Sequence, residues 1–286
     1  MIQCNTSLLN CFILSSTINL SFISLFDSLS NKTSLLGGSK KKVINHNNDF
    51  LICLTREEPN EASVLARRIC DRRTGIGADG LIIGLPGSNG ADLVMVLYNA
   101  DGSSAEMSGN GIRCLAQAHA MANGTGAASF EIDTGGGRRH VEIDGDDPEA
   151  QVTVGMGLVG PGPGVPDEIS GSIGQSLAAT ADLGNPHLVV AVEDCSIVDI
   201  SELGSRYEAF YSDGINVEVI SVSDREPNTI DMVVWERGVG VTQACGTGAA
   251  AAAVRAHQWD LVADEVGVQM PGGSVRVLVG EEPILV

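Results

Sequence analysis

The sequence predicts an α+β fold built from two related halves. Three observations support this. Short apolar runs separated by Gly-rich turns outnumber the helical stretches, two Ala-rich helical stretches are apolar on every side, and several motifs recur at a constant offset. A helix that is apolar all round is normally buried, so each Ala-rich stretch is expected at the centre of its own half.

Eleven β-like runs and three helical stretches are recognisable in order along the chain. The expected strands are 49–54, 81–85, 93–98, 129–132, 140–143, 151–154, 187–192, 217–222, 230–235, 266–270 and 275–279. Helical spacing or Ala-rich composition marks 61–71, 112–122 and 249–259. Strand is therefore expected to exceed helix.

The charge of the chain excludes several function classes. Its 286 residues carry 36 Asp and Glu against 17 Lys and Arg, a net charge of −19, whereas nucleic acids and anionic membranes are bound by clustered basic residues. Lys is absent after residue 42, so residues 43–286 cannot form the Schiff base of a pyridoxal phosphate enzyme. No cofactor motif is visible, and we expect no cofactor and no metal.

Residues 1–42 differ from the rest of the chain and hold all four Lys with a single acid. Their uncharged run lacks the basic start and the small-residue cleavage site of a secretory signal, and Asn and Ser dilute it below the hydrophobicity of a transmembrane span. We expect a disordered or non-native leader outside the fold, with targeting or membrane contact as the alternative.

The cysteines indicate a reducing compartment. The seven are odd in number, widely spaced and without a C-x-x-C pair, so neither a zinc site nor a disulfide framework is indicated. The cytoplasm is the expected location.

A weak duplication predicts where a functional site lies. Ser108-Gly-Asn-Gly precedes one Ala-rich stretch and Cys245-Gly-Thr-Gly precedes the other, 137 positions later (245 − 108). The same offset relates Asn48 to Asn185, Asp79 to Asn216 and Asn99 to Glu236. Four matches in one register predict two halves that face each other across a pseudo-twofold axis, with a cleft between them.

The residues expected in that cleft are suited to chemistry at an α-carbon. Helix N-termini present unpaired N–H groups that bind a carboxylate, and they lower the pKa of a thiol from about 8.5. Two acid–base groups on opposite faces of the neighbouring carbon would invert it, because one removes a proton and the other returns one from behind.

Less specific interpretations of these residues remain open. The Gly-x-Gly turns could serve only close helix packing, and Cys245 alone could be an inert core residue. Gly75–Gly80 matches a dinucleotide-binding pattern, but the strand that should precede it and the helix that should follow are missing.

Taken together, the motifs resemble diaminopimelate epimerase. They are Asn48-Asp-Phe, Cys70-Asp-Arg with Gly75–Gly80, Asn99-Ala-Asp-Gly-Ser, Ser108-Gly-Asn-Gly-Ile-Arg-Cys, Gly184-Asn-Pro-His, Gly214-Ile-Asn-Val-Glu, Glu236-Arg-Gly-Val-Gly and Ala244-Cys-Gly-Thr-Gly. The resemblance covers about residues 43–286. It implies two pseudo-symmetric domains, each a curved, mostly antiparallel sheet or barrel around a central helix, with the active site between them. We assign 43–155 and 156–280 to the two domains, and 281–286 to a shortened final strand that returns to the first.

The resemblance also implies an activity and a set of site residues. The activity is the cofactor-independent epimerisation of L,L-2,6-diaminopimelate to meso-diaminopimelate, for lysine and peptidoglycan synthesis. It implies a small amino-acid substrate, with homodimer formation left open. Cys245 and Ser108 stand at the two acid–base positions, with Glu236 and His187 beside them. The groups implied in substrate binding are Asn48, Asn99, Gly109, Asn110, Asn185, Asn216, Glu236, Arg237, Gly246 and Thr247.

Ser108 departs from the family pattern, which has a Cys there. A hydroxyl is a far weaker acid than a thiol, so Ser108 donates a proton more readily than it acts as an anionic base. Cys114 is a conceivable substitute, although its place along the helix should turn it away from the cleft. The alternatives are therefore a proline or hydroxyproline racemase, epimerase or dehydratase of the same superfamily, or a carboxylate-binding relative with weakened catalysis.

Overall fold

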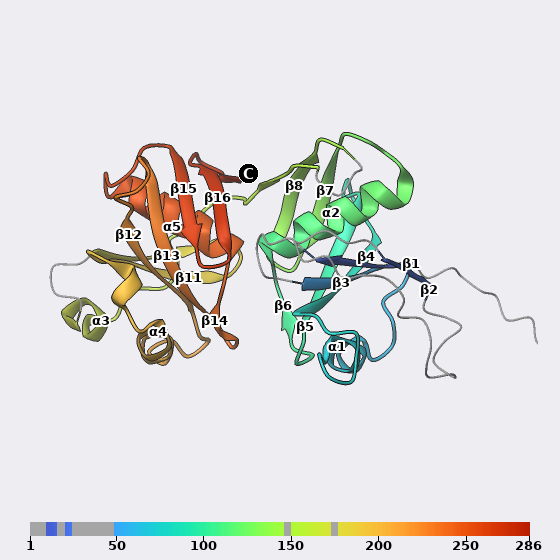
Figure 1. The fold of residues 1–286 in the computed structure, drawn as a ribbon, viewed down its shortest axis with the longest axis horizontal. Coiled ribbons are helices and arrows are strands. Elements are labelled where there is room, and N and C mark those ends of the chain that lie inside the picture. Colours follow the sequence, from blue (N-terminus) through green and yellow to red (C-terminus); the bar gives the residue numbers. More distant parts are fainter. Residues whose placement is uncertain (1–9, 16–20, 25–48, 146–149, 173–176) are drawn as a thin grey trace, which may run out of the picture.

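A computed structural model describes residues 10–15, 21–24, 49–145, 150–172 and 177–286. Figure 1 shows two lobes side by side, each with a sheet that curves around one long helix. These helices are α2 (Gly109–Asn123) in the first lobe and α5 (Gly246–Gln258) in the second. The predicted α+β class with two related halves is confirmed.

The paired strands of the first lobe lead from β3 to β9, the strand that meets the second lobe. Neighbours run β3–β4–β5–β7–β8–β9, and β6 adds to β5. The β3–β4 and β5–β7 pairs are parallel and the others antiparallel. The bounds are β3 Asp49–Leu54, β4 Gly80–Pro86, β5 Leu93–Asn99, β6 Ser104–Ala105, β7 Ala128–Thr134, β8 Gly137–Ile143 and β9 Val152–Gly155.

The second lobe repeats this order. Its neighbours run β10–β11–β12–β13–β15–β16–β17, and β14 adds to β13. The parallel pairs are β11–β12 and β13–β15, the counterparts of those in the first lobe. The bounds are β10 Leu177–Asp182, β11 Pro186–Ala191, β12 Asn216–Val222, β13 Thr229–Glu236, β14 Gly240–Thr242, β15 Glu265–Met270, β16 Gly273–Leu278 and β17 Ile284–Leu285.

Helical crossovers connect the first parallel pair of each lobe. Helix α1 (Ala62–Cys70) links β3 to β4, and α4 (Ile200–Glu208) links β11 to β12. The remaining helical segments are α3 (Asp167–Ser172) and the 3₁₀ turn η1 (Cys195–Ile197). The run Gly75–Gly80 leads from α1 into β4, so it lacks the strand and helix flanks that a dinucleotide site requires.

The last strand joins the two lobes. β17 pairs antiparallel with β16 of its own lobe and with β9 of the first lobe, where Leu285 lies opposite Val154. The backbone N–H of Met156 also donates to the carbonyl of Pro283 at 2.8 Å. Residues near the C-terminal end thus return to the first lobe and make one continuous ladder of strands.

Two segments of the expected leader belong to the sheet. β1 (Asn10–Ser15) pairs antiparallel along all of β3, and β2 (Ser21–Ser24) pairs with β1. The expectation that residues 1–42 stay outside the fold is therefore wrong for these two segments. The physical reason is that one edge of β3 would otherwise be unpaired, and an uncharged strand can satisfy its backbone groups. β10 pairs with β11 in the same way in the second lobe.

All eleven expected strands and three expected helices are present, with ends shifted by a few residues. Several elements were missed for lack of an apolar pattern. β10 has the Ala-rich sequence L-A-A-T-A-D, and α4 buries only Gly204 and Tyr207. The Asp199 N-cap, which accepts from the N–H groups of Ser201 and Glu202, is the signal that could have revealed α4.

The N-termini of the two central helices touch at a pair of glycines. A Cβ built on Gly109 would lie 3.0 Å from the Cα of Gly246, and the converse distance is also 3.0 Å. The side chain of Leu285 from β17 covers the same point, 3.5 Å from the first of these Cβ positions. Only residues without a side chain allow this approach, so the contact sets the distance between the lobes.

This contact makes a prediction about stability. We expect Gly109→Ala to lower the free energy of unfolding by about 1–3 kcal/mol, because the added methyl group overpacks a backbone contact that cannot easily relax. The measurement is urea unfolding followed by circular dichroism. Gly171→Ala is the matched control, since a Cβ there meets nothing within 4 Å, and we expect unchanged or slightly higher stability. Equal stability of the two variants would contradict the prediction.

Candidate active site

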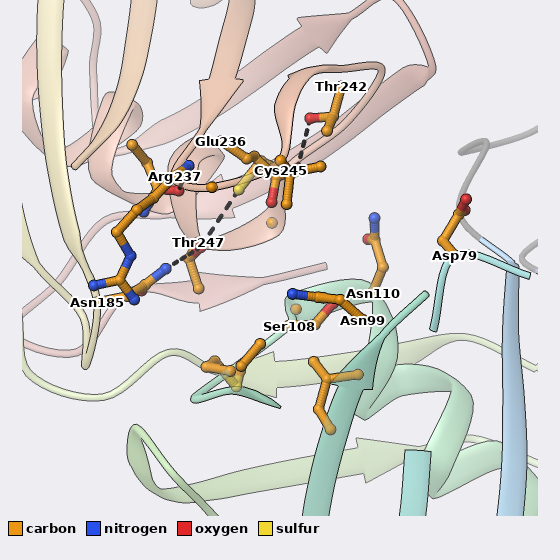
Figure 2. Close-up of a pocket in the computed structure, with 18 of the residues that line it drawn as sticks. Asp79, Asn99, Ser108, Asn110, Asn185, Glu236, Arg237, Thr242, Cys245 and Thr247 are labelled. Carbon is orange, nitrogen blue, oxygen red and sulfur yellow. Dashed lines mark hydrogen bonds between the residues drawn. The ribbon is translucent and has the colours of Figure 1, made fainter. Parts of the chain in front are cut away.

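A cavity of about 540 Å³ lies between the lobes and is lined by residues of both. Figure 2 shows the groups of the first lobe, Asn99, Ser108 and Asn110, facing those of the second, which include Glu236, Cys245 and Thr247. The turn between β13 and β14 and the segment that leads from β6 into α2 form opposite parts of the wall.

Ser108 and Cys245 occupy equivalent positions at the helix ends. Each is an N-cap with an extended backbone, at φ −143° and ψ 118° for Ser108 and φ −137° and ψ 115° for Cys245. Ser108 Oγ accepts from the N–H of Gly111 at 3.0 Å, and Cys245 Sγ accepts from the N–H of Gly248 at 3.4 Å. The earliest N–H groups of each helix have no partner within the helix and can bind an anion in the cavity.

The electrostatic surroundings of Cys245 correct one expectation. Burial raises the pKa of its thiol well above the ordinary value, and the carboxylates of Glu236 and Glu218 raise it further. Hydrogen bonds from Thr247 and Gly248 act in the opposite direction but are outweighed. The helix N-terminus therefore does not give a thiolate here, because desolvation and two negative charges disfavour a third anion.

Glu236 is held at the cavity wall beside the thiol. Its Oε1 accepts from the hydroxyl of Thr242 at 2.6 Å, across the β13–β14 turn. Burial raises the pKa of the Glu236 carboxyl, and the negative charge of Glu218 adds to that effect. A charged ammonium group entering the cavity would find this carboxylate poorly hydrated and available for pairing.

A buried chain of hydrogen bonds leads to the thiol from behind. His187 is fully buried, with Nδ1 2.7 Å from Glu218 Oε1 and Nε2 3.1 Å from Asn185 Oδ1. Asn185 donates to Thr247 Oγ1 at 3.4 Å, and that hydroxyl lies 3.5 Å from Cys245 Sγ. His187 thus contacts the back of Asn185, and it orients the amide that faces the cavity.

The second lobe also fixes the turn that carries Arg237. Asn216 Oδ1 accepts from the backbone N–H of Arg237 at 2.9 Å. Glu208, at the end of α4, accepts from Trp235 Nε1 at 2.6 Å and from the N–H of Gly238 at 3.2 Å. The turn is therefore held on both sides of Arg237.

The corresponding turn of the first lobe is held by α1. Ser63 Oγ donates to the carbonyl of Gly102 at 2.6 Å, and Arg67 Nε donates to that of Asp101 at 2.9 Å. Asn99 precedes this turn, and its side chain donates to Ser103 Oγ at 3.0 Å. The crossover helix of each lobe therefore supports the hairpin that brings polar groups to the cavity.

The structure brings together most of the residues singled out by sequence. Of these predicted residues, the ones at the cavity wall are Asn99, Ser108, Gly109, Asn110, Asn185, Asn216, Glu236, Arg237, Cys245, Gly246 and Thr247. His187 lies one layer behind them, and Asn48 falls outside the described residues. Cys114 is buried and does not line the cavity, so it does not replace Ser108.

Three polar residues of this region were missed. Glu218 is an acid inside the apolar β12, where a buried charge signals a partner, and this could have been recognised. Thr242 and Glu106 stand in short loop and strand segments without a distinctive pattern, and only the fold places them at the cavity.

The described part of the chain lacks two kinds of feature. No three His, Cys, Asp or Glu side chains there gather closely enough to hold a metal ion. None of its helices has the length and apolarity needed to cross a membrane.

Comparison with known proteins identifies the family. The family model described as Diaminopimelate epimerase matches residues 42–160 and 179–283. The chain is 37% identical over 247 residues to diaminopimelate epimerase of Trichodesmium erythraeum, covering 80% of this chain and 87% of that protein. It is 38% identical over 249 residues to the Synechocystis protein of the same name, with the same coverage. The chain belongs to the diaminopimelate epimerase family.

Solved structures share the fold at much lower identity. A protein from Pseudomonas aeruginosa described as a predicted epimerase has a TM-score of 0.65 and 12% identity, covering 98% of this chain and 95% of that one. A hydroxyproline epimerase from Agrobacterium vitis has a TM-score of 0.63 and 14% identity, covering 85% and 86%. These likenesses show that the fold of this chain is shared by both proteins.

The raised pKa of Cys245 predicts that its thiol reacts slowly near neutral pH. We expect alkylation by iodoacetamide to be slow near neutral pH and to accelerate only at pH values above the ordinary thiol pKa, because the thiolate is the nucleophile. Peptide mass spectrometry of the Cys245 segment across a pH series measures the rate.

The variant Glu236→Gln should shift this pH profile to lower pH, since one of the two carboxylates that oppose the thiolate is removed. Glu202→Gln, on the exposed face of α4, is the control and should leave the profile unchanged. An unchanged pH profile in Glu236→Gln, or one shifted to higher pH, would contradict the assignment of Glu236 as a cause of the raised pKa of Cys245.

Proposed function

We propose that this chain interconverts L,L- and meso-2,6-diaminopimelate without a cofactor, as an isomerase of lysine and peptidoglycan precursor synthesis. The proposal rests on its family and on one structural observation. Two equivalent helix N-termini meet at one cavity, each capped by a side chain that can exchange a proton. Both lobes thereby supply one anion-binding end and one acid–base group.

The helix ends suit the carboxylate next to the reacting carbon. Loss of the α-proton leaves negative charge that spreads onto this carboxylate, and fixed N–H dipoles that face it stabilise that charge. Gly109 and Asn110 on one side and Gly246 and Thr247 on the other line the cavity, and their N–H groups are the proposed donors. Because the donors are held by the helices, they need no reorganisation when the charge develops.

The two acid–base groups are unequal. Inversion requires one group to enter as an anion that removes the α-proton and the other to give its own proton to the opposite face. Cys245 can serve as that anion once its thiol is deprotonated, and the positive charge of a bound α-ammonium would lower its pKa toward that state. Ser108 is a much weaker acid, so it donates efficiently but accepts a proton as an alkoxide only at high cost.

The remaining polar wall suits a long substrate with charge at both ends. Asn99, Asn185 and Asn216 provide amide groups, and Arg237 provides a guanidinium for the distal carboxylate. Fixing both ends holds one of two similar α-carbons in the reacting position. We further propose that the enzyme works in the cytoplasm, with a homodimer left open.

Because of Ser108, two other functions remain alternatives. Its hydroxyl is compatible with a proline or hydroxyproline racemase, epimerase or dehydratase, and with a protein that binds a carboxylate without turnover. The large polar cavity and Arg237 favour the longer, doubly charged substrate. Diaminopimelate is therefore the substrate on which the proposal depends.

Hydrogen exchange at the α-carbon tests the proposal. Wild-type protein is incubated in D₂O with L,L-diaminopimelate, and separately with L-proline and trans-4-hydroxy-L-proline, and NMR follows loss of the α-proton signal. We expect exchange with diaminopimelate only. Exchange with a proline substrate instead, or with none of the three, would overturn the proposal.

Replacing Ser108 tests the unequal pair. We expect exchange in the wild-type protein to be faster than inversion, because Cys245 can remove and return protons on its own face. Ser108→Cys should raise the rate of inversion by about a hundredfold, which is typical of gaining an effective general base. Ser104→Cys, which adds a thiol at an exposed position that does not line the cavity, is the control. An unchanged or lower inversion rate in Ser108→Cys would contradict this view of the pair.

A further inference from the structure

An ion pair spans the cavity between the lobes. Arg237 Nη2 of the second lobe donates to Glu106 Oε2 of the first at 2.8 Å, although the residues are 131 positions apart. Both side chains line the cavity. The sequence motifs did not predict this contact, and Glu106 has no part in the function described so far.

Both members of the pair keep unused hydrogen-bonding capacity. Among the described residues, the second oxygen of Glu106 and the Nε and Nη1 groups of Arg237 make no hydrogen bond. The cavity therefore contains a positive group and a negative group side by side, each with a free edge. An amino-acid group likewise has an ammonium and a carboxylate attached to one carbon. Its ammonium can bind the acid of the pair while its carboxylate binds the arginine.

We propose that Glu106 is a specificity-determining residue that binds the distal ammonium group of the substrate, while Arg237 binds the distal carboxylate. This assignment rests on the proposed function, because 2,6-diaminopimelate has a complete amino-acid group at its distal end. Contact with both lobes at once also means that the distal group holds the halves of the cavity together.

The other acids of the cavity are less suited to this role. Asp79 already binds Arg72 and the N–H of Asp49. Asp101 accepts from both the hydroxyl and the N–H of Ser103. Glu236 is held by Thr242 beside the thiol, at the reacting end. Glu106 is the acid in direct contact with the arginine that the distal carboxylate needs.

Exposure sets the expected size of the effect. The side chain of Arg237 is 27% exposed and that of Glu106 is 48% exposed. Water therefore weakens their interaction when no substrate is bound. A bound substrate would exclude part of this water and strengthen the contact of Glu106 with an ammonium. We expect loss of the Glu106 charge to weaken substrate binding by about five- to tenfold, a moderate effect for a partly exposed charge pair.

The test compares two ligands that differ only in the distal ammonium. KM from α-hydrogen exchange and Kd from calorimetry are measured for L,L-diaminopimelate and for L-2-aminopimelate, which keeps the distal carboxylate but lacks the amine. Glu106→Gln should weaken diaminopimelate binding and leave aminopimelate binding unchanged or tighter. Glu106→Asp should restore part of the preference, because it restores the charge at a shorter reach.

Glu265→Gln is the matched control. It removes the acid of another partly exposed ion pair, with Arg276 at 3.2 Å, on strands away from the cavity wall. Both ligands should bind this variant as they bind the wild type.

The outcomes separate this inference from the proposed function. If wild-type protein neither exchanges nor binds diaminopimelate, the proposed function fails and the assignment of Glu106 fails with it. If the wild type is active but Glu106→Gln weakens both ligands equally, weakens neither or tightens both, the assignment of Glu106 alone is overturned. Equal tightening would mean that Glu106 competes with the substrate for Arg237.

Discussion

The contact of Gly109 with Gly246 fixes the geometry on which the rest of the site depends. At this point two helix N-termini approach within backbone contact, and Leu285 of the last strand covers them. The helices can meet there because the residues at their ends are small and their apolar sides are buried inside the two lobes. Bringing the two ends together aims two sets of N–H groups and two capping side chains at one volume, an arrangement that neither lobe can create alone.

On this symmetric frame the chemistry is asymmetric. The backbone angles of Ser108 and Cys245 differ by only a few degrees, yet one side chain is a hydroxyl and the other a thiol. Glu236 and Glu218 both belong to the second lobe and both act on Cys245. The resting thiol is therefore protonated, which is the form that donates, and a positive charge from a ligand is required to favour the form that accepts.

Supporting residues behind the cavity wall determine how precisely the polar groups are held. Glu218 and His187 are buried together and reach the wall through Asn185, while Glu208 and Asn216 fix the turn of Arg237. Buried polar groups of this kind are costly unless each has a partner, so the chain of hydrogen bonds also limits the alternative arrangements of the strands. Helices α1 and α4, which do not line the cavity, take part by holding the two hairpins.

The amino-acid sequence by itself determined the fold class, the duplication, the two buried helices and most of the cavity residues. It did so because apolar periodicity and a repeat in constant register are local properties of the chain. It did not determine the pairing of β1 with β3, since edge pairing depends on which backbone groups remain free. Only the tertiary structure decided that His187 lies behind the wall and that the pKa of Cys245 is raised. The contact of Glu106 with Arg237 was also beyond the sequence, because burial and charge neighbours come from segments that are far apart along the chain.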